Sequence, residues 1–172
     1  FISTNIFSQN STVNPYSWES LDTQSKELYR KGYIDEAIIV GATALKQAEK
    51  EFGMANANYA VSCNQLGIYY SEKSDTTNAM SYYSLALYIH TKVLEKKHDD
   101  YAAVCHNLSS LFFKMGKYKK ALNFGAEAYF VMKEKYGKRY VPLIPTYYLL
   151  GQIYQTLGDY NSAIMMYAYA VS

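Results

Sequence analysis

A turn-like segment recurs four times along this 172-residue chain at a fixed interval. The segments KGYIDEA at 31–37, MGKYKKA at 115–121 and LGDYNSA at 157–163 each place an Ala five residues after a Gly, and KSDTTNA at 73–79 has Ser at that Gly position. Gly32, Ser74, Gly116 and Gly158 are evenly spaced, which defines a 42-residue period. A fixed period of about 20–50 residues is typical of repeat architectures, in which one helical or strand unit stacks on the next.

Upstream of each turn, apolar and small residues follow helical spacing. In the second unit they stand at i, i+3, i+4 and i+7, which is one face of a helix: Cys63, Leu66, Gly67 and Tyr70. The same stripe returns in 105–112 and in 147–154. We therefore predict a helix before each turn.

Downstream of the turn, Ala79, Tyr83 and Ala86 are spaced four and three residues apart, which makes a second helical stripe. Alanine occupies the first and the last of these positions in all four units. Small side chains let two paired helices approach closely, and Gly at the turn ends the first helix in a left-handed conformation without a Cβ penalty. Each unit is therefore predicted to be a helix, a tight turn and a second helix.

A single helix pair cannot cover its own apolar stripe, so neighbouring pairs must stack into a continuous core. We predict an all-α fold, a right-handed α–α superhelical solenoid of about four helix-turn-helix repeats. The 42-residue period divides the chain into an N-terminal extension at 1–17, repeats at 18–59, 60–101 and 102–143, and an incomplete fourth repeat at 144–172.

These motifs resemble the tetratricopeptide repeat (TPR). The segments LGIYY at 66–70 and LGQIYQTLGDYNSA at 150–163 carry its Leu-Gly pair, the aromatic residue that follows, and the later Gly-x-Tyr and Ala. The usual unit has about 34 residues, and the 42-residue unit is similar to that of kinesin light chain. The segment HDDYAAVCHNL at 98–108 also follows the light-chain pattern of His, acidic residues and Asn-Leu. The resemblance covers about 18–172.

The chain departs from this pattern in two ways. Gly41 and Gly125 stand where the second and fourth units have Tyr83 and Tyr167. The fourth unit also has two prolines before its Leu-Gly pair. Because proline suits the first turn of a helix, we expect the first helix of that unit to start close to Pro145.

The resemblance implies that the first helix of each unit lines a concave groove, which holds an extended or helical peptide of a partner protein. Amide side chains there would bond the main chain of the ligand, cationic ones its carboxylates, and apolar ones its side chains. Plain solvent-facing helix surface is the alternative for each position. The predicted groove residues are Lys26, Arg30, Asn64, Ile68, Ser71, His106, Ser110, Phe113, Lys114, Tyr148, Gln152 and Gln155.

No catalytic, phosphate-binding or zinc-binding motif is recognisable. Cys105 and His106 form no dyad, because adjacent helical residues point in different directions. His90, His98 and His106 are eight residues apart and do not by that spacing converge on a metal ion. Cys63 and Cys105 occupy equivalent positions of stacked units, which are too distant for a disulfide, so we predict buried free thiols. We predict no enzyme activity, cofactor or metal within these residues.

Charge and hydropathy exclude two further classes of partner. The net charge of +2 is too small to indicate a nucleic-acid partner, and no apolar run is long enough to span a membrane. The charge is polarised: residues 1–86 carry −3 and residues 87–172 carry +5, which indicates either solvated helix faces or a preference for acidic peptide near that end. Free thiols and the lack of a visible signal peptide, unless one has been removed, favour a cytoplasmic location.

The function predicted from these features is a non-catalytic protein–protein interaction module that binds a peptide or helix of a partner. The alternative is a sensory or regulatory repeat arm of a larger multidomain effector, such as a peptidase or signalling protein, with catalysis elsewhere. A third hypothesis is self-association through the open apolar end of the fourth unit.

Overall fold

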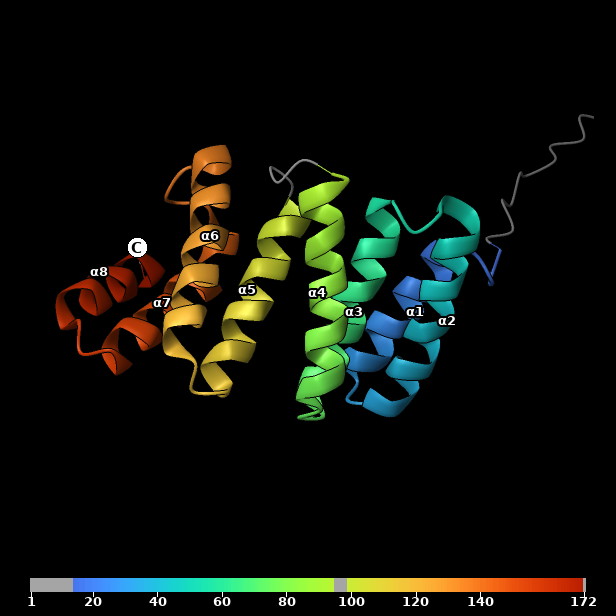
Figure 1. The fold of residues 1–172 in the computed structure, drawn as a ribbon, viewed down its shortest axis with the longest axis horizontal. Helices are drawn as coiled ribbons and strands as arrows, with labels where there is room; N and C mark the ends of the chain where they lie inside the picture. The colour runs from blue at the N-terminus through green and yellow to red at the C-terminus, as the bar shows by residue number, and fades with distance from the viewer. Residues whose placement is uncertain (1–13, 95–98, 172) are drawn as a thin grey trace, which may run out of the picture.

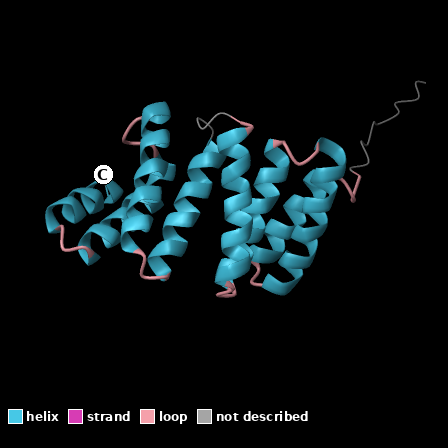
Figure 2. Ribbon diagram, in the orientation of Figure 1, coloured by secondary structure: helices cyan, strands magenta, loops and turns pink. Residues whose placement is uncertain are grey.

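The computed structural model describes residues 14–94 and 99–171, and every regular element in that part of the chain is helical. The helices follow one another as four antiparallel pairs in a single row (Figures 1 and 2), which confirms the predicted all-α solenoid. The pairs are α1 (Trp18–Arg30) with α2 (Ile34–Phe52), α3 (Ala57–Glu72) with α4 (Thr76–Lys92), α5 (Asp99–Lys114) with α6 (Tyr118–Tyr136), and α7 (Ile144–Thr156) with α8 (Tyr160–Val171). A 3₁₀ helix, η1 (Val141–Leu143), precedes α7.

The divisions predicted at 60 and 102 fall within the first turns of α3 and α5. The period fixes the spacing of the units but not where each helix begins. Those starts depend on capping residues: Ser17, Asn56 and Asp75 each accept a backbone hydrogen bond at the start of α1, α3 and α4.

The turn glycines inside the pairs adopt the left-handed conformation that was predicted for them, and Ser74 adopts it as well. The φ angles of Gly32, Gly116 and Gly158 are 85°, 71° and 82°, and that of Ser74 is 60°. Ser74 is the one non-Gly residue with positive φ in the described part of the chain. The turn geometry therefore persists in the second unit although its sequence departs from the other three.

The small residues of the repeat lie in the core. Seven of the eight alanines at the two repeated positions are buried, with exposed fractions of 2% or less, and Ala170 on the last helix is half-buried. The seven are Ala37, Ala44, Ala79, Ala86, Ala121, Ala128 and Ala163. Their burial brings the two helices of each pair into close contact, as predicted.

The order of packing defines an inner surface. Each second helix packs against the first helix of its own pair and against the first helix of the next pair. The first helices α1, α3, α5 and α7 also contact one another in succession, and no contact of that extent joins successive second helices among the described residues. Elements on the inner side of a bent stack lie closer together, so we call the surface formed by α1, α3, α5 and α7 the concave face.

The connection between α6 and α7 is rebuilt by its prolines. Helix α7 begins at Ile144 with Pro145 in its first turn, which confirms the predicted start. It has 13 residues, whereas α3 and α5 have 16 each, and η1 takes the place of their first turn.

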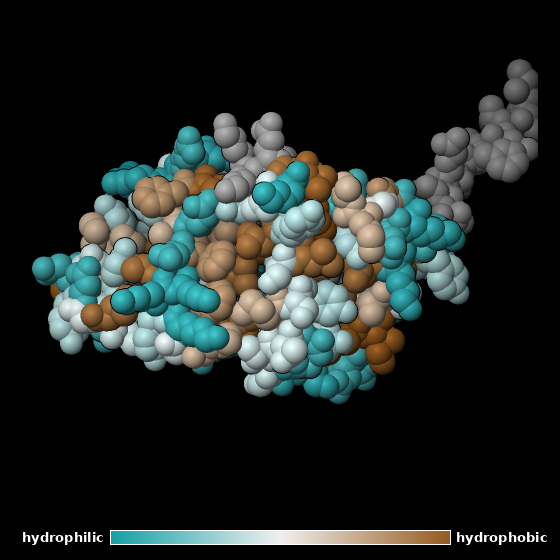
Figure 3. Space-filling view, in the orientation of Figure 1, coloured by the Kyte–Doolittle hydropathy of each residue, from teal (hydrophilic) through white to brown (hydrophobic). Residues whose placement is uncertain are grey.

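Apolar surface gathers over the middle of the row in the view of Figure 3, around α4, α5 and α6. Exposed apolar side chains on α4 and α6 include Leu85, Tyr88 and Phe130. The last helix also exposes apolar residues, with 67% of Ile164 and 87% of Val171 accessible. None of the described helices is both long and apolar enough to cross a membrane.

Candidate functional site

The concave face carries two hollows that meet at Asn107, a residue of α5. The first, the small hollow, has a volume of about 130 Å³ and lies between α1, α3 and α5. Four of the predicted groove residues line it together: Ile68, Ser71, Ser110 and Lys114. Tyr29, Glu72 and Tyr83 complete its wall.

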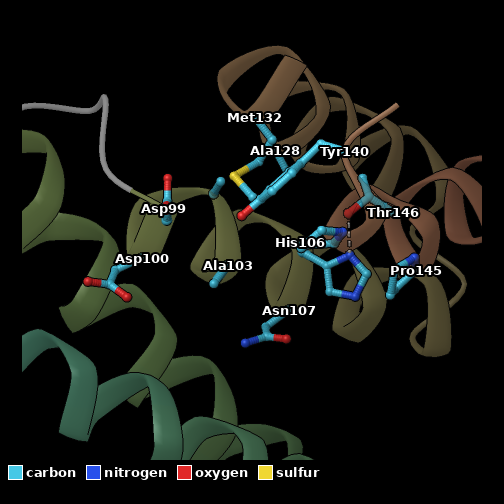
Figure 4. A pocket seen from close by; sticks show the side chains of 12 residues that line it. Asp99, Asp100, Ala103, His106, Asn107, Ala128, Met132, Tyr140, Pro145 and Thr146 are labelled. Carbon is cyan, nitrogen blue, oxygen red and sulfur yellow. Dashed lines mark hydrogen bonds between the residues drawn. The ribbon is translucent and has the colours of Figure 1, made fainter. Parts of the chain in front are cut away.

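The second hollow, the large cavity, has a volume of about 400 Å³. It lies between the first half of α5, the second half of α6 and the connection that leads into α7 (Figure 4). His106 is the predicted groove residue that lines it. Figure 4 shows Asp99 and Asp100 toward one end of this cavity and His106, Pro145 and Thr146 toward the other.

Two polar bonds link successive first helices on this face. The side-chain amide of Asn107 donates to Oδ1 of Asn64 at 2.9 Å, which joins α3 to α5. Nδ1 of His106 lies 3.0 Å from Oγ1 of Thr146, which joins α5 to α7 (Figure 4). Asn64 and His106 are therefore structural partners as well as candidate ligand contacts.

The remaining predicted groove residues do not line either hollow. Lys26 forms an ion pair with Asp22 at 2.7 Å, and Arg30 is exposed. The half-buried Phe113 ring packs against Tyr118, with centroids 5.6 Å apart.

In the fourth pair, the predicted groove residues Tyr148 and Gln155 contact one side chain of α8. The Tyr148 ring, 56% exposed, lies 5.6 Å from the ring of Tyr167, and the Tyr167 hydroxyl donates to Gln155 at 2.9 Å. Gln152 is half-buried. A ligand-binding role for these residues stays a prediction.

Sequence reasoning missed Asn107, which lies at the centre of the face. A signal for it was present, because Ala103, Asn107, Ser110 and Lys114 follow i, i+4, i+7 and i+11 along one helix face. The residues on the far wall of the large cavity had no comparable signal, since they come from η1 and the first turn of α7, where the prolines interrupt the periodic helix pattern.

Burial sets the charge state of the site. It lowers the pKa of His106, so the imidazole is neutral near neutral pH. At the rim, Asp99 accepts hydrogen bonds from Lys135 at 2.8 Å and from the Tyr136 hydroxyl at 2.6 Å, and this contact raises the pKa of Lys135. Asp100 is exposed and forms no ion pair with any of the described residues.

The two cysteines are buried free thiols, as predicted. Burial raises the pKa of Cys63 to about 12, so this thiol stays protonated. Within 14–94 and 99–171, no three His, Cys, Asp or Glu side chains are arranged to hold a metal ion. His98 lies outside the described residues.

Comparison with known sequences assigns the repeat. Sequence models of the tetratricopeptide repeat match residues 64–134 and residues 144–172. The chain is a tetratricopeptide repeat protein. Repeats of this family are a protein-interaction scaffold, and their fold is typically non-catalytic.

Solved structures show the same fold. BtubC (BKLC) from P. vanneervenii superposes with a TM-score of 0.78 at 20% identity, over 89% of this chain and 61% of that one. The nearly identical TPR-like repeats of a putative kinesin light chain from Podosopora anserina superpose with a TM-score of 0.79 at 16% identity, over 92% and 75%.

Among curated proteins, a clustered mitochondria protein homolog from Aedes aegypti is 23% identical over 152 residues. That match covers 88% of this chain and 10% of the mosquito protein. This TPR chain therefore spans about a tenth of the length of the curated relatives that it matches.

Proposed function

We propose that this TPR chain binds a peptide or helix of a partner protein on its concave face. The observation that carries the proposal is the meeting of four predicted groove residues in the small hollow, next to the large cavity and separated from it by Asn107. Two hollows in a row suit an elongated ligand better than a compact small molecule.

The groups in the small hollow fit the main chain of such a ligand. Ser71 and Ser110 offer hydroxyls, which both donate and accept hydrogen bonds. Asn107 uses one amide hydrogen on Asn64 and retains a second donor and its carbonyl oxygen. Lys114 adds an exposed cation for a carboxylate of the ligand.

A double substitution tests the proposal. Phage that display a random peptide library are selected on the wild-type chain, and the enriched peptides are then measured by fluorescence anisotropy on Asn64→Ala/Lys114→Glu. We expect binding to fall by about tenfold or more. Helicity and melting should stay nearly unchanged, because Lys114 is exposed and the Asn107 amide that loses its acceptor on Asn64 borders a hollow open to water.

Lys46→Glu is the matched control, because Lys46 is exposed on α2, away from the concave face. It reproduces the charge change of Lys114→Glu and should leave binding unchanged. Equal binding of the enriched peptides to the double variant and to the control would place the interaction on another surface.

One observation favours a second candidate, a recognition arm within a larger effector: the matching segment of the mosquito relative is a tenth of a much longer chain. Intact-mass spectrometry of the native polypeptide tests this. A mass near the 19.6 kDa of these residues contradicts it, and a much larger mass supports it.

A further inference from the structure

We propose that the large cavity is the anchor pocket of the concave face, which takes one apolar side chain of a bound peptide that carries Lys or Arg beside it. This inference rests on the proposed function and names the chemistry of its ligand. The cavity is distinct from the small hollow, and His106 alone among the groove residues predicted from the sequence lines it.

The walls of the cavity are suited to an apolar side chain. Ala103 and Ala128 present small side chains, Pro145 and Pro142 close the far side, and Met132 is flexible enough to adjust to an occupant. A volume of about 400 Å³ is within the lower range of ligand pockets and has room for one large side chain.

The cavity has a local origin in the rebuilt connection before α7. In the second pair the position of Ala103 is filled by the larger Val61, one period earlier. In the fourth pair the position of Asp100 is Pro142, and the first turn is the 3₁₀ helix η1. The large cavity is lined by this shortened start of α7 and by the small residues of α5 and α6 that face it.

A carboxylate at the rim of the large cavity favours a peptide with a basic residue beside its apolar anchor. Asp99 already bonds Lys135 and Tyr136, whereas the exposed carboxylate of Asp100 is bonded to none of the described cations. The basic cluster at Lys117, Lys119 and Lys120 lies around the turn at the opposite ends of α5 and α6. At the near end of α6, Lys135 is paired with Asp99, while Lys133 and Lys138 lie over tyrosine rings. Among the described residues at the rim, Asp100 is therefore the carboxylate available to a cation of the ligand.

The opposite end of the cavity offers a main-chain contact. The bond to Thr146 fixes the His106 ring through Nδ1, and Nε2 on the other edge of the ring bonds none of the described residues. The neutral imidazole can accept or donate one hydrogen bond there, according to its tautomer. A peptide would thus be held at three points: its cation at Asp100, its apolar side chain in the cavity and its backbone at His106.

The test uses the random peptide library selected on the wild-type chain. We expect the enriched peptides to share an apolar residue with Lys or Arg adjacent or next but one. Ala103→Trp fills the cavity from an exposed helix position and should weaken these peptides by about tenfold or more. Ala168→Trp on α8 is the matched control, since Ala168 is exposed and remote from the cavity, and should leave their affinity unchanged.

A second variant isolates the charge. Asp100→Asn keeps the shape of the side chain and removes its charge, and should weaken the same peptides by about two- to fivefold, in a way that disappears at high salt. Glu36→Gln on α2 is the control for net charge.

The outcomes separate this inference from the proposed function. Enriched peptides without the apolar-basic pair, or peptides that bind Ala103→Trp normally but lose binding on Asn64→Ala/Lys114→Glu, would overturn the anchor pocket and leave the concave face in place. Peptides insensitive to every concave variant, or a library from which nothing is enriched, would overturn both.

Discussion

The even and odd helix pairs differ in which helix carries the Gly that allows close packing and in which side chain fills the space over it. In the second and fourth pairs the small residue is a Gly on the first helix, and an aromatic ring of the second helix lies over it. A Cβ added at Gly67 would come within 2.5 Å of the Tyr83 ring, and one at Gly151 within 2.5 Å of the Tyr167 ring. In each even pair, the space over the Gly is therefore filled by a tyrosine of the same pair.

In the first and third pairs the Gly is on the second helix, and the first helix of the next pair fills the space. A Cβ at Gly41 would meet Leu66 and Tyr69 of α3 at 3.2 Å, and one at Gly125 would meet Leu150 of α7 at 2.9 Å. The odd pairs are thus interlocked with the pairs that follow them. The position of the close-packed Gly therefore alternates from one 42-residue repeat to the next. As a result, the first pair is interlocked with the second, and the third with the fourth.

The largest effect should come from Gly67→Ala. Tyr83 is 2% exposed, so its ring has no room to move away from the new methyl group. Overpacking costs about 1–3 kcal/mol, and alanine regains about 1 kcal/mol of helix propensity. Because the Tyr83 ring cannot move, the cost should lie at the upper end of that range, which leaves a net loss of about 2 kcal/mol in the free energy of unfolding. Urea denaturation followed by circular dichroism measures this loss.

A double-mutant cycle sharpens this prediction. Tyr83→Ala alone should be strongly destabilising, because it leaves a cavity in the core. In that background Gly67→Ala should become neutral or stabilising, since the ring that it would strike is gone and its helix propensity remains. A loss of the same size in both backgrounds would show that Tyr83 is not what requires Gly at position 67.

Gly151→Ala should have a smaller effect although its geometry is similar. The Tyr167 ring is half-buried at the end of the row and can turn toward solvent. That movement would sacrifice the hydrogen bond from its hydroxyl to Gln155. We expect a loss of about 1 kcal/mol in the same urea experiment, and a loss as large as that of Gly67→Ala would contradict the view that the end of the row is more adaptable.

Gly125→Ala tests the interlock between the third and fourth pairs. The new Cβ would lie 2.9 Å from both Leu150 Cδ2 and Ser109 Oγ. Leu150 Cδ2 is the end of a flexible side chain, but Ser109 is held by a 2.7 Å hydrogen bond to the carbonyl of Ala121. We expect a loss of about 0.5–1 kcal/mol by urea denaturation, and Gly125→Ala/Ser109→Ala should recover part of it if the hydroxyl is the obstacle.

Most of the fold could be predicted from the sequence, because its information is local and periodic. Helical stripes, turn glycines and buried alanines recur with the 42-residue period, and the start of α7 followed from Pro145. The alternation could be predicted only in part. The sequence shows Gly41 at the repeat position that Tyr83 occupies in the next unit. The spacing does not indicate that Leu66 and Tyr69 of the next pair fill the space over Gly41.

The candidate site was less predictable for the same reason. The small hollow follows from a helix stripe, and four of its residues were found. The large cavity depends on how the α6–α7 connection folds against α5, and its lining includes both Asp100 and Pro145, which are not related by the repeat. A periodic pattern specifies equivalent positions, whereas a site at an irregular junction depends on contacts that break the period.

Gly41→Ala should have the smallest effect and is the most informative about the odd pairs. Its Cβ would lie 3.2 Å from Leu66 Cδ2 and Tyr69 Cε2, so each neighbour must shift by only a few tenths of an ångström. That cost should nearly cancel the gain of about 1 kcal/mol in helix propensity, which leaves the free energy of unfolding within about 0.5 kcal/mol of wild type. Because the Tyr69 hydroxyl lies 3.0 Å from Ser25 Oγ, a ring that cannot shift would instead strain the contact between α1 and α3. A loss as large as that of Gly67→Ala would then show that the odd junction is as rigid as the even pairs, and the distinction between adaptable and rigid units would fail.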